Sequence, residues 1–123
     1  MRRSTIALAI VTAALGACSK ENGVVSCTIF TPANGTVCEE YAGLSPPDQV
    51  MWSNSCFVSD ATADGGVHPS ARFEYVPCAH ANALGGCRLK NAPITFWYYA
   101  DGPYTEADIP ALCAQIDATQ LAP

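Results

Sequence analysis

The sequence predicts a small α+β domain, in which a mostly antiparallel sheet of β-hairpins carries two helices and is held by three disulfide bonds. Three observations support this fold class. Short segments rich in β-branched and aromatic residues alternate with turn residues, two segments begin with helix-capping signals, and six of the seven cysteines lie between residues 27 and 113. Several cysteines in a domain of this size are typical of a disulfide framework in an exported protein.

The first two strands flank a turn signal. Residues 24–31 (VVSCTIFT) and 36–41 (TVCEEY) are rich in β-branched residues, and Asn34-Gly35 between them favours a hairpin. Because side chains alternate along a strand, the sequence assigns each of them to a face. We expect one face to carry Cys27, Ile29 and Cys38. The other face should carry Phe30, Val37 and Tyr41.

A helix should follow this hairpin. Ser45 is a good N-cap, the prolines after it are tolerated in a first helical turn, and Asp48 suits the positive end of the helix dipole. We therefore expect a helix over residues 46–58. The side chains within reach of a core would be Val50, Trp52 and Cys56.

The remaining elements follow from composition. Residues 59–70 are expected to form a loop, residues 72–76 (RFEYV) a short strand, and residues 77–86 an irregular segment. Residues 87–90 and 93–100 predict a second hairpin about Asn91-Ala92. A last helix is expected over residues 106–117, capped by Thr105 or by Asp108, and Pro110 favours the later start because proline fits best near a helix beginning.

The two halves of the chain share one pattern. From Cys27 to Cys56, and again from Cys87 to Cys113, a cysteine is followed by a hairpin, a Tyr-Ala pair, a Ser/Thr-x-x-Asp cap, a helix and a second cysteine. The pattern predicts an internal ββα duplication, although a capped helix after a hairpin is also common by chance. A duplication predicts three bridges: Cys27–Cys56, Cys87–Cys113 and Cys38–Cys78. Without it, 15 pairings are open.

A metal site is the other interpretation of the six cysteines. Zinc sites usually contain close pairs such as C-x₂-C, whereas the two nearest cysteines here, Cys78 and Cys87, are nine positions apart. The spacing therefore favours disulfide bonds.

The first 17 residues have the character of a signal peptide. Two arginines precede an uncharged apolar run over residues 6–15, which is too short to span a bilayer. The motif Leu15-Gly16-Ala17-Cys18 matches a bacterial lipobox, so we expect cleavage between Ala17 and Cys18 and fatty acylation of Cys18. A plain signal peptide, with Cys18 as an ordinary thiol, is the alternative.

Lipid on Cys18 would make a membrane the first partner of the chain. Residues 18–23 would form a short lipidated tether, in which the five residues from Ser19 to Gly23 reach at most about 18 Å. Ser19 stands where aspartate favours inner-membrane retention, so we expect the outer membrane if the cell is Gram-negative. Residues 24–123 would then form a single domain that faces the periplasm or the cell surface.

Charge excludes two classes of interaction. The chain has eleven acidic and six basic residues, and two of the basic ones lie in the signal peptide, which leaves a mature chain of 106 residues with a formal charge of −7. Without a basic cluster, binding to nucleic acid is not expected. Attraction to anionic lipid headgroups is not expected either.

No motif predicts a catalytic, cofactor or metal site. Residues 60–65 (DATADG) begin like a calcium loop, but the twelfth position is Ala71, where a glutamate is needed. His68 and His80 lie in loop-like surroundings without the spacing of a metal site. No serine lies in a G-x-S-x-G elbow, so a small hydrolase is the last alternative to a non-enzymatic role.

The aromatic run of residues 96–99 (FWYY) is the best candidate for binding. In a strand, Phe96 and Tyr98 point to one side and Trp97 and Tyr99 to the other. One pair should join the core. The other pair, Trp97 and Tyr99, together with Tyr104, would form an exposed platform for an envelope glycan or a protein partner. The alternative is that a helix covers that face as well.

Three motifs carry a resemblance. They are Cys38-Glu39-Glu40-Tyr41, Gly85-Gly86-Cys87, and residues 96–100 followed by Thr105, Asp108 and Cys113. In these motifs the chain resembles a group of short, cysteine-rich predicted bacterial lipoproteins without assigned activity, and the resemblance implies a shared fold. With the lipobox and the acidic small domain, we expect a non-enzymatic envelope lipoprotein with a structural or interaction role.

Overall fold

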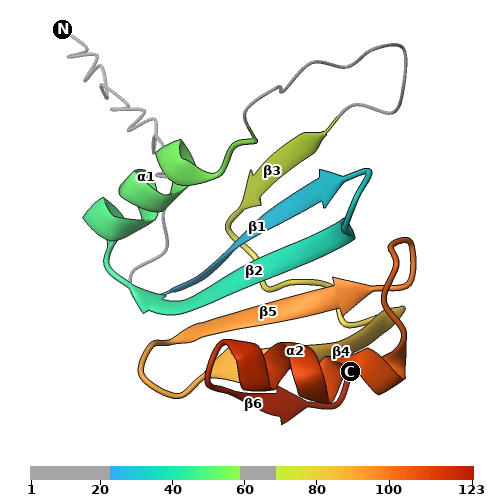
Figure 1. Cartoon of the computed structure of the whole chain (residues 1–123). Helices are drawn as coiled ribbons and strands as arrows, with labels where there is room; N and C mark the ends of the chain where they lie inside the picture. Colours follow the sequence, from blue (N-terminus) through green and yellow to red (C-terminus); the bar gives the residue numbers. More distant parts are fainter. Residues whose placement is uncertain (1–22, 59–68) are drawn as a thin grey trace, which may run out of the picture.

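A six-stranded antiparallel sheet forms the body of the protein (Figure 1). The computed structural model describes residues 23–58 and 69–123. The strands lie in the order β3-β1-β2-β5-β4-β6. Together with two short helices and three disulfide bonds, they confirm a small, mostly antiparallel domain. Among the described residues, no helix has both the length and the apolar character needed to cross a bilayer.

The first hairpin is built on a three-residue turn. β1 (Gly23–Thr31) pairs with β2 (Gly35–Leu44), and the pair next to the turn is Thr31 with Gly35. The N–H of Asn34 donates to the carbonyl of Thr31 (3.2 Å), and Gly35 has a φ of +68°, a backbone conformation that favours glycine. A turn followed by one left-handed residue is common in hairpin loops of this length.

The register that this turn sets differs from the one that the sequence predicts, and with it the face on which each side chain lies. A two-residue turn at Asn34-Gly35 would place odd-numbered residues of β1 opposite even-numbered residues of β2, whereas the observed register pairs Cys38 with Thr28. A shift of one residue exchanges the two faces of a strand. Cys38 therefore shares a face with Phe30, and the prediction that it lies with Cys27 and Ile29 is wrong. The opposite face carries Cys27, Ile29, Val37 and Tyr41.

Helix α1 (Pro46–Ser55) begins where the sequence predicts and ends three residues earlier. Its N-cap is Ser45, whose hydroxyl oxygen accepts a hydrogen bond from a backbone N–H of the first turn. The helix contacts the sheet through Trp52, which stacks on Tyr41 with ring centroids 4.0 Å apart. Val50, which we expected near the core, is instead 52% exposed.

The chain then continues along the outer edge of β1. β3 (Ser70–Glu74) pairs with β1. It overlaps the strand predicted at residues 72–76 but begins and ends two residues earlier. After it, residues 75–82, which we call the strap, are fastened to the face of the sheet that carries Cys38. Cys78 of the strap forms a disulfide bond with Cys38, and its N–H donates to a carboxylate oxygen of Glu40 (3.0 Å).

The second hairpin joins β4 (Ala83–Leu89) to β5 (Ile94–Tyr99). It confirms the predicted turn region, but the expectation of an irregular segment up to residue 86 is wrong, since residues 83–86 belong to β4. The sequence did not predict the beginning of β4 because Gly85 and Gly86 have low strand propensity. A Cβ atom on Gly86 would lie 2.9 Å from the ring of Trp97, so the absence of a side chain there lets the indole lie close to the strand.

The C-terminal helix is shorter than predicted and leads to a further strand. η1 (Glu106–Asp108) and α2 (Ile109–Gln115) occupy the predicted helical segment. The backbone N–H and the hydroxyl of Thr105 both donate to the carboxylate of Asp108, each over 2.8 Å, and these bonds lower the pKa of Asp108. After α2, Asp117 takes a φ of +51°, and β6 (Ala118–Leu121) pairs with β4 as an edge strand that we did not predict.

The order of elements is the same in both halves of the sheet. The elements β1, β2, α1 and β3 form one half, and β4, β5, α2 and β6 form the other. One row of paired residues crosses the centre: Cys27 with Glu39, Glu39 with Phe96, and Phe96 with Cys87. The bridges are Cys27–Cys56, Cys87–Cys113 and Cys38–Cys78, which are the pairings that the repeated pattern predicts.

Gly35→Ala should destabilise the protein more than Gly43→Ala. Both glycines have positive φ values (+68° and +72°), so alanine at either position is strained by about 1–2 kcal/mol. A Cβ atom at position 35 would also lie 2.4 Å from the Cα atom of Gly102, whereas one at position 43 would meet nothing within 4 Å. We expect the free energy of unfolding, measured in urea, to fall by roughly 3 kcal/mol or more in Gly35→Ala. Equal losses in the two variants would contradict this close backbone contact.

Candidate functional site

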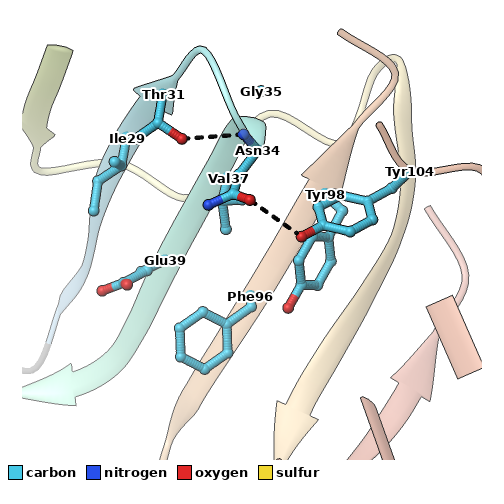
Figure 2. A pocket seen from close by; sticks show the side chains of 9 residues that line it. All are labelled: Ile29, Thr31, Asn34, Gly35, Val37, Glu39, Phe96, Tyr98 and Tyr104. Atoms are coloured by element: carbon cyan, nitrogen blue, oxygen red, sulfur yellow. Dashed lines mark hydrogen bonds between the residues drawn. The ribbon is translucent and has the colours of Figure 1, made fainter. Parts of the chain in front are cut away.

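A groove of about 300 Å³ opens on the face of the sheet that carries Cys27. Side chains of β1, β2 and β5, of the first turn and of the loop after β5 line it, as Figure 2 shows. The groove has an apolar floor and a polar rim. Its lining residues are Ile29, Thr31, Asn34, Gly35, Val37, Glu39, Phe96, Tyr98 and Tyr104.

The strand register builds the floor of the groove. Ile29, Val37 and Tyr98 are paired in one row across β1, β2 and β5. Two residues further along, Glu39 is paired with Phe96. Because alternate residues of a strand share a face, two aliphatic side chains and two aromatic rings come together beside one carboxylate.

The helices leave this part of the sheet open. α1 contacts the far end of the hairpin, where Trp52 stacks on Tyr41. α2 packs on β4 and β6, and Ile109 contacts the backbone at Gly85. No residue of α1 or α2 lines the groove, and its apolar side chains on β1, β2 and β5 remain partly exposed.

Two rings and an amide form the rim at the turn end of the groove. The backbone N–H of Asn34 donates to the carbonyl and to the hydroxyl of Thr31, both at 3.2 Å. The hydroxyl of Tyr104 donates to Oδ1 of Asn34 (3.5 Å), and its ring meets that of Tyr98 edge-on with centroids 5.7 Å apart (Figure 2). These contacts position the polar groups that face the open side.

The loop that carries Tyr104 is tied to the first hairpin by Asp101. The hydroxyl and the backbone N–H of Thr36 donate to its two carboxylate oxygens, over 2.5 and 2.8 Å. These hydrogen bonds lower the pKa of Asp101. Because Gly35 also lies against Gly102, the rim is assembled from two segments far apart in the sequence.

Glu39 brings a carboxylate to the floor of the groove. The hydroxyl of Tyr41 donates to it over 2.6 Å. Burial, and then the hydrogen bond and negative charge of Glu39, raise the pKa of Tyr41 far above its usual value. Burial and the neighbouring Tyr104 also raise the pKa of Tyr98. The groove therefore places the phenol of Tyr98, with its raised pKa, near the side chain of Glu39.

The aromatic platform expected from the sequence lies on the other face and is covered. Trp97 is only 4% exposed, and His80 of the strap stacks on its ring with centroids 3.9 Å apart. Tyr99 donates its hydroxyl to the carbonyl of Ala79. The expectation of an exposed Trp97 is therefore wrong, and Tyr99 instead borders a separate hollow of about 280 Å³. Of the three expected residues, Tyr104 alone lines the groove.

Phe96 and Tyr98 are groove residues that the sequence did not single out. Alternation placed them opposite Trp97, and the structure confirms this. The strap determines which face of the sheet is covered, because its residues pack on Trp97 and Tyr99. Its sequence has no apolar periodicity that would predict this packing. The Cys38–Cys78 bond could have shown that the strap covers Trp97, because Cys38 is paired with Trp97 on the same face of the sheet. That inference also needs the correct register of the first hairpin, which decides the face on which Cys38 lies.

Chemistry outside the groove is sparse in the described part of the chain. Nε2 of His80 lies 3.9 Å from the carboxylate of Glu40, and no serine of residues 23–58 or 69–123 is hydrogen-bonded to it. Within the same ranges, no three metal-ligating side chains gather at one point. The calcium-like segment 60–65, His68, and the lipobox with Ala17 and Cys18 lie outside the described residues.

No protein-family model, curated protein or solved structure matches this chain. What the groove can do therefore follows from its own side chains. Its rings present apolar surface, its hydroxyl and amide groups exchange hydrogen bonds, and Glu39 adds one negative charge. Such a combination suits binding of a polar molecule that also has an apolar face.

Alkaline pH should destabilise the protein through Tyr41. Its pKa is raised in the folded state, so its contribution to stability is complete below the usual tyrosine pKa of about 10 and is lost as the pH rises above that value. We expect the free energy of unfolding to fall by up to about 1.4 kcal/mol per pH unit for this one group. In Tyr41→Phe, urea unfolding between pH 9 and pH 11 should show a shallower decline. Identical declines in both proteins would contradict this role of Tyr41.

Proposed function

We propose that the protein is a lipid-anchored, non-enzymatic component of the bacterial cell envelope, and that it acts by binding a partner in the groove. The groove is the observation that carries this proposal. Aromatic and aliphatic side chains remain partly exposed there, next to fixed polar groups, although two helices pack elsewhere on the sheet. A concave apolar surface with a polar rim is typical of a binding site.

Export to the envelope is supported by the cysteines and by the lipobox. All six cysteines of the described residues form disulfide bonds, which persist in oxidising compartments. The apolar run that ends at Leu15-Gly16-Ala17-Cys18 supports cleavage before Cys18 and lipid on its thiol. Serine at position 19 supports the outer membrane as the place of anchoring in a Gram-negative cell.

An envelope glycan is the ligand class that the groove favours. The faces of sugar rings are apolar enough to stack on aromatic rings, and Phe96 and Tyr98 supply such rings. Sugar hydroxyls need both acceptors and donors, which Glu39, Asn34 and Tyr104 supply at the floor and rim. A peptide segment of an envelope protein is the second candidate, because aromatic grooves also receive apolar side chains.

We further propose that the two halves derive from duplication of a ββα unit. The row from Cys27 to Cys87 supports this, because its centre lies between Glu39 and Phe96 and the bridged cysteines stand at equivalent places on each side. Cys27 of β1 is bonded to Cys56, the residue that ends α1, and Cys87 of β4 is bonded to Cys113 within α2. The groove would then lie across the junction of the two units.

Intact-mass analysis tests the anchor. Protein purified from membranes of expressing cells should lack residues 1–17, carry acyl chains on Cys18, and show no free thiol on alkylation. Cys18→Ser should block processing, since the lipobox requires the cysteine. An unmodified amino terminus in the wild-type chain would reject lipid anchoring, whatever the groove binds.

Peptidoglycan binding tests the groove. Tyr104→Ala and Phe96→Ala should each weaken pull-down by purified sacculi about tenfold, because each removes an aromatic contact of the kind that dominates binding sites. Phe30→Ala is the matched control, since Phe30 lies on the opposite face of β1 and should leave binding unchanged. Circular dichroism would verify that each variant is folded. Wild-type affinity in both groove variants would reject the groove as the glycan site.

A further inference from the structure

The exposed apolar side chains of the described residues concentrate at one helix. Three of them lie in α1 or within two residues of its end: Val50 is 52% exposed, Met51 57% and Phe57 67%. The inner side of the same helix is buried, since Gln49 is fully covered and Trp52 stacks on Tyr41. The outer side of α1 therefore exposes Val50 and Met51, with Phe57 just beyond the end of the helix, next to the polar Asn54 and Ser55.

This outer side lies at the end of the sheet where the chain enters. Gly23, the first described residue, pairs with Leu44, which is followed directly by the N-cap of α1. Figure 1 shows α1 beside the beginning of β1. The ten residues of α1 extend over about 15 Å. The five residues from Ser19 to Gly23 reach at most about 18 Å, so a lipid on Cys18 would keep α1 close to the bilayer.

The charges of this region favour apolar contact with lipid. The one charged residue of α1 is Asp48, whose carboxylate accepts a hydrogen bond from the hydroxyl of Ser45 (2.6 Å). The helix has no lysine or arginine to attract anionic headgroups, and the mature chain is strongly acidic. Insertion of apolar side chains is the remaining way for such a surface to hold a membrane.

We infer that Val50, Met51 and Phe57 insert into the interface of the bilayer that holds the lipidated Cys18. α1 is then a second membrane contact, and it orients the domain on the surface. This inference rests on the proposed lipid anchor and is independent of what the groove binds. Membrane binding strengthens with the apolar area that is buried in the interface, and these three side chains would add such area to that of the lipid.

Oxidation of Met51 can test this contact. The sequence contains two methionines, and Met1 lies in the expected signal peptide, so Met51 is the one methionine of the mature chain. The lipidated full-length product would be inserted into preformed vesicles of phosphatidylethanolamine and phosphatidylglycerol (3:1) and treated with chloramine T, a water-soluble oxidant that forms methionine sulfoxide. Ile116→Met adds an internal reference on α2, where the side chain of Ile116 is 38% exposed.

We expect Met51 to be oxidised at least fivefold more slowly than the methionine introduced at position 116, and Phe57→Ser to reduce this protection. Equal oxidation rates in protein that floats with the vesicles would overturn the inference and leave the lipid anchor intact. Protection that disappears when the protein is diluted tenfold on the vesicles would indicate a second copy as the occupant and would also overturn it. Protein that does not float would reject the anchor, and the membrane contact with it.

Discussion

The fold depends on three disulfide bonds, because its apolar core is small. Of the ten buried apolar residues in the described part, five are bridged cysteines. The bridges close segments of 26 to 40 residues, and each contributes about 3–4 kcal/mol in the chain-entropy model. Domains of this size are stable by only about 5–15 kcal/mol, so oxidation decides whether the chain folds. The three bridges therefore account for a large share of the stability of this fold.

The same bonds explain why the groove is open. Cys27 and Cys87 lie in one row of paired residues, with Glu39 and Phe96 between them. Cys27 holds the end of α1 to β1, and Cys87 holds α2 to β4, so the helices lie beside the groove and leave Val37, Phe96 and Tyr98 partly exposed. On the opposite face, the Cys38–Cys78 bond holds the strap over Trp97, and that face is covered. The disulfide framework thereby determines which aromatic residues meet solvent.

The features that could be predicted from the sequence are those with local causes. Ser45 and Thr105 mark helix starts because their side chains pair with backbone or carboxylate groups three residues away. Ser45 was predicted, and Thr105 and Asp108 were the two alternatives for the last helix, where they cap η1 and α2 in turn. β4 was missed in part because Gly85 and Gly86 lack strand propensity, although close packing against Ile109 and Trp97 requires small residues there. These two glycines are explained by tertiary contacts, which a pattern in the sequence does not reveal.

The candidate site was harder to predict because it depends on register. One extra residue in the first turn exchanged the faces of the hairpin, and a covered platform then replaced the expected exposed one. Alternation identified two pairs of aromatic residues correctly, but alternation alone cannot say which pair is covered. Tyr104, which the sequence analysis grouped with Trp97 and Tyr99, is the one of these three residues that lines the groove. The choice between faces was made by residues 75–82, whose path follows from one disulfide bond.

The position of the groove relative to the proposed anchor gives the two surfaces separate tasks. β1 has nine residues and, at about 3.4 Å per residue, separates its two ends by roughly 27 Å. Gly23 and α1 lie at one end, while Asn34 and the rim of the groove lie beyond the other. A domain held to lipid through its first residues therefore directs the rim away from the bilayer. Binding in the groove and contact of α1 with the membrane can occur at the same time, because the first hairpin keeps them apart.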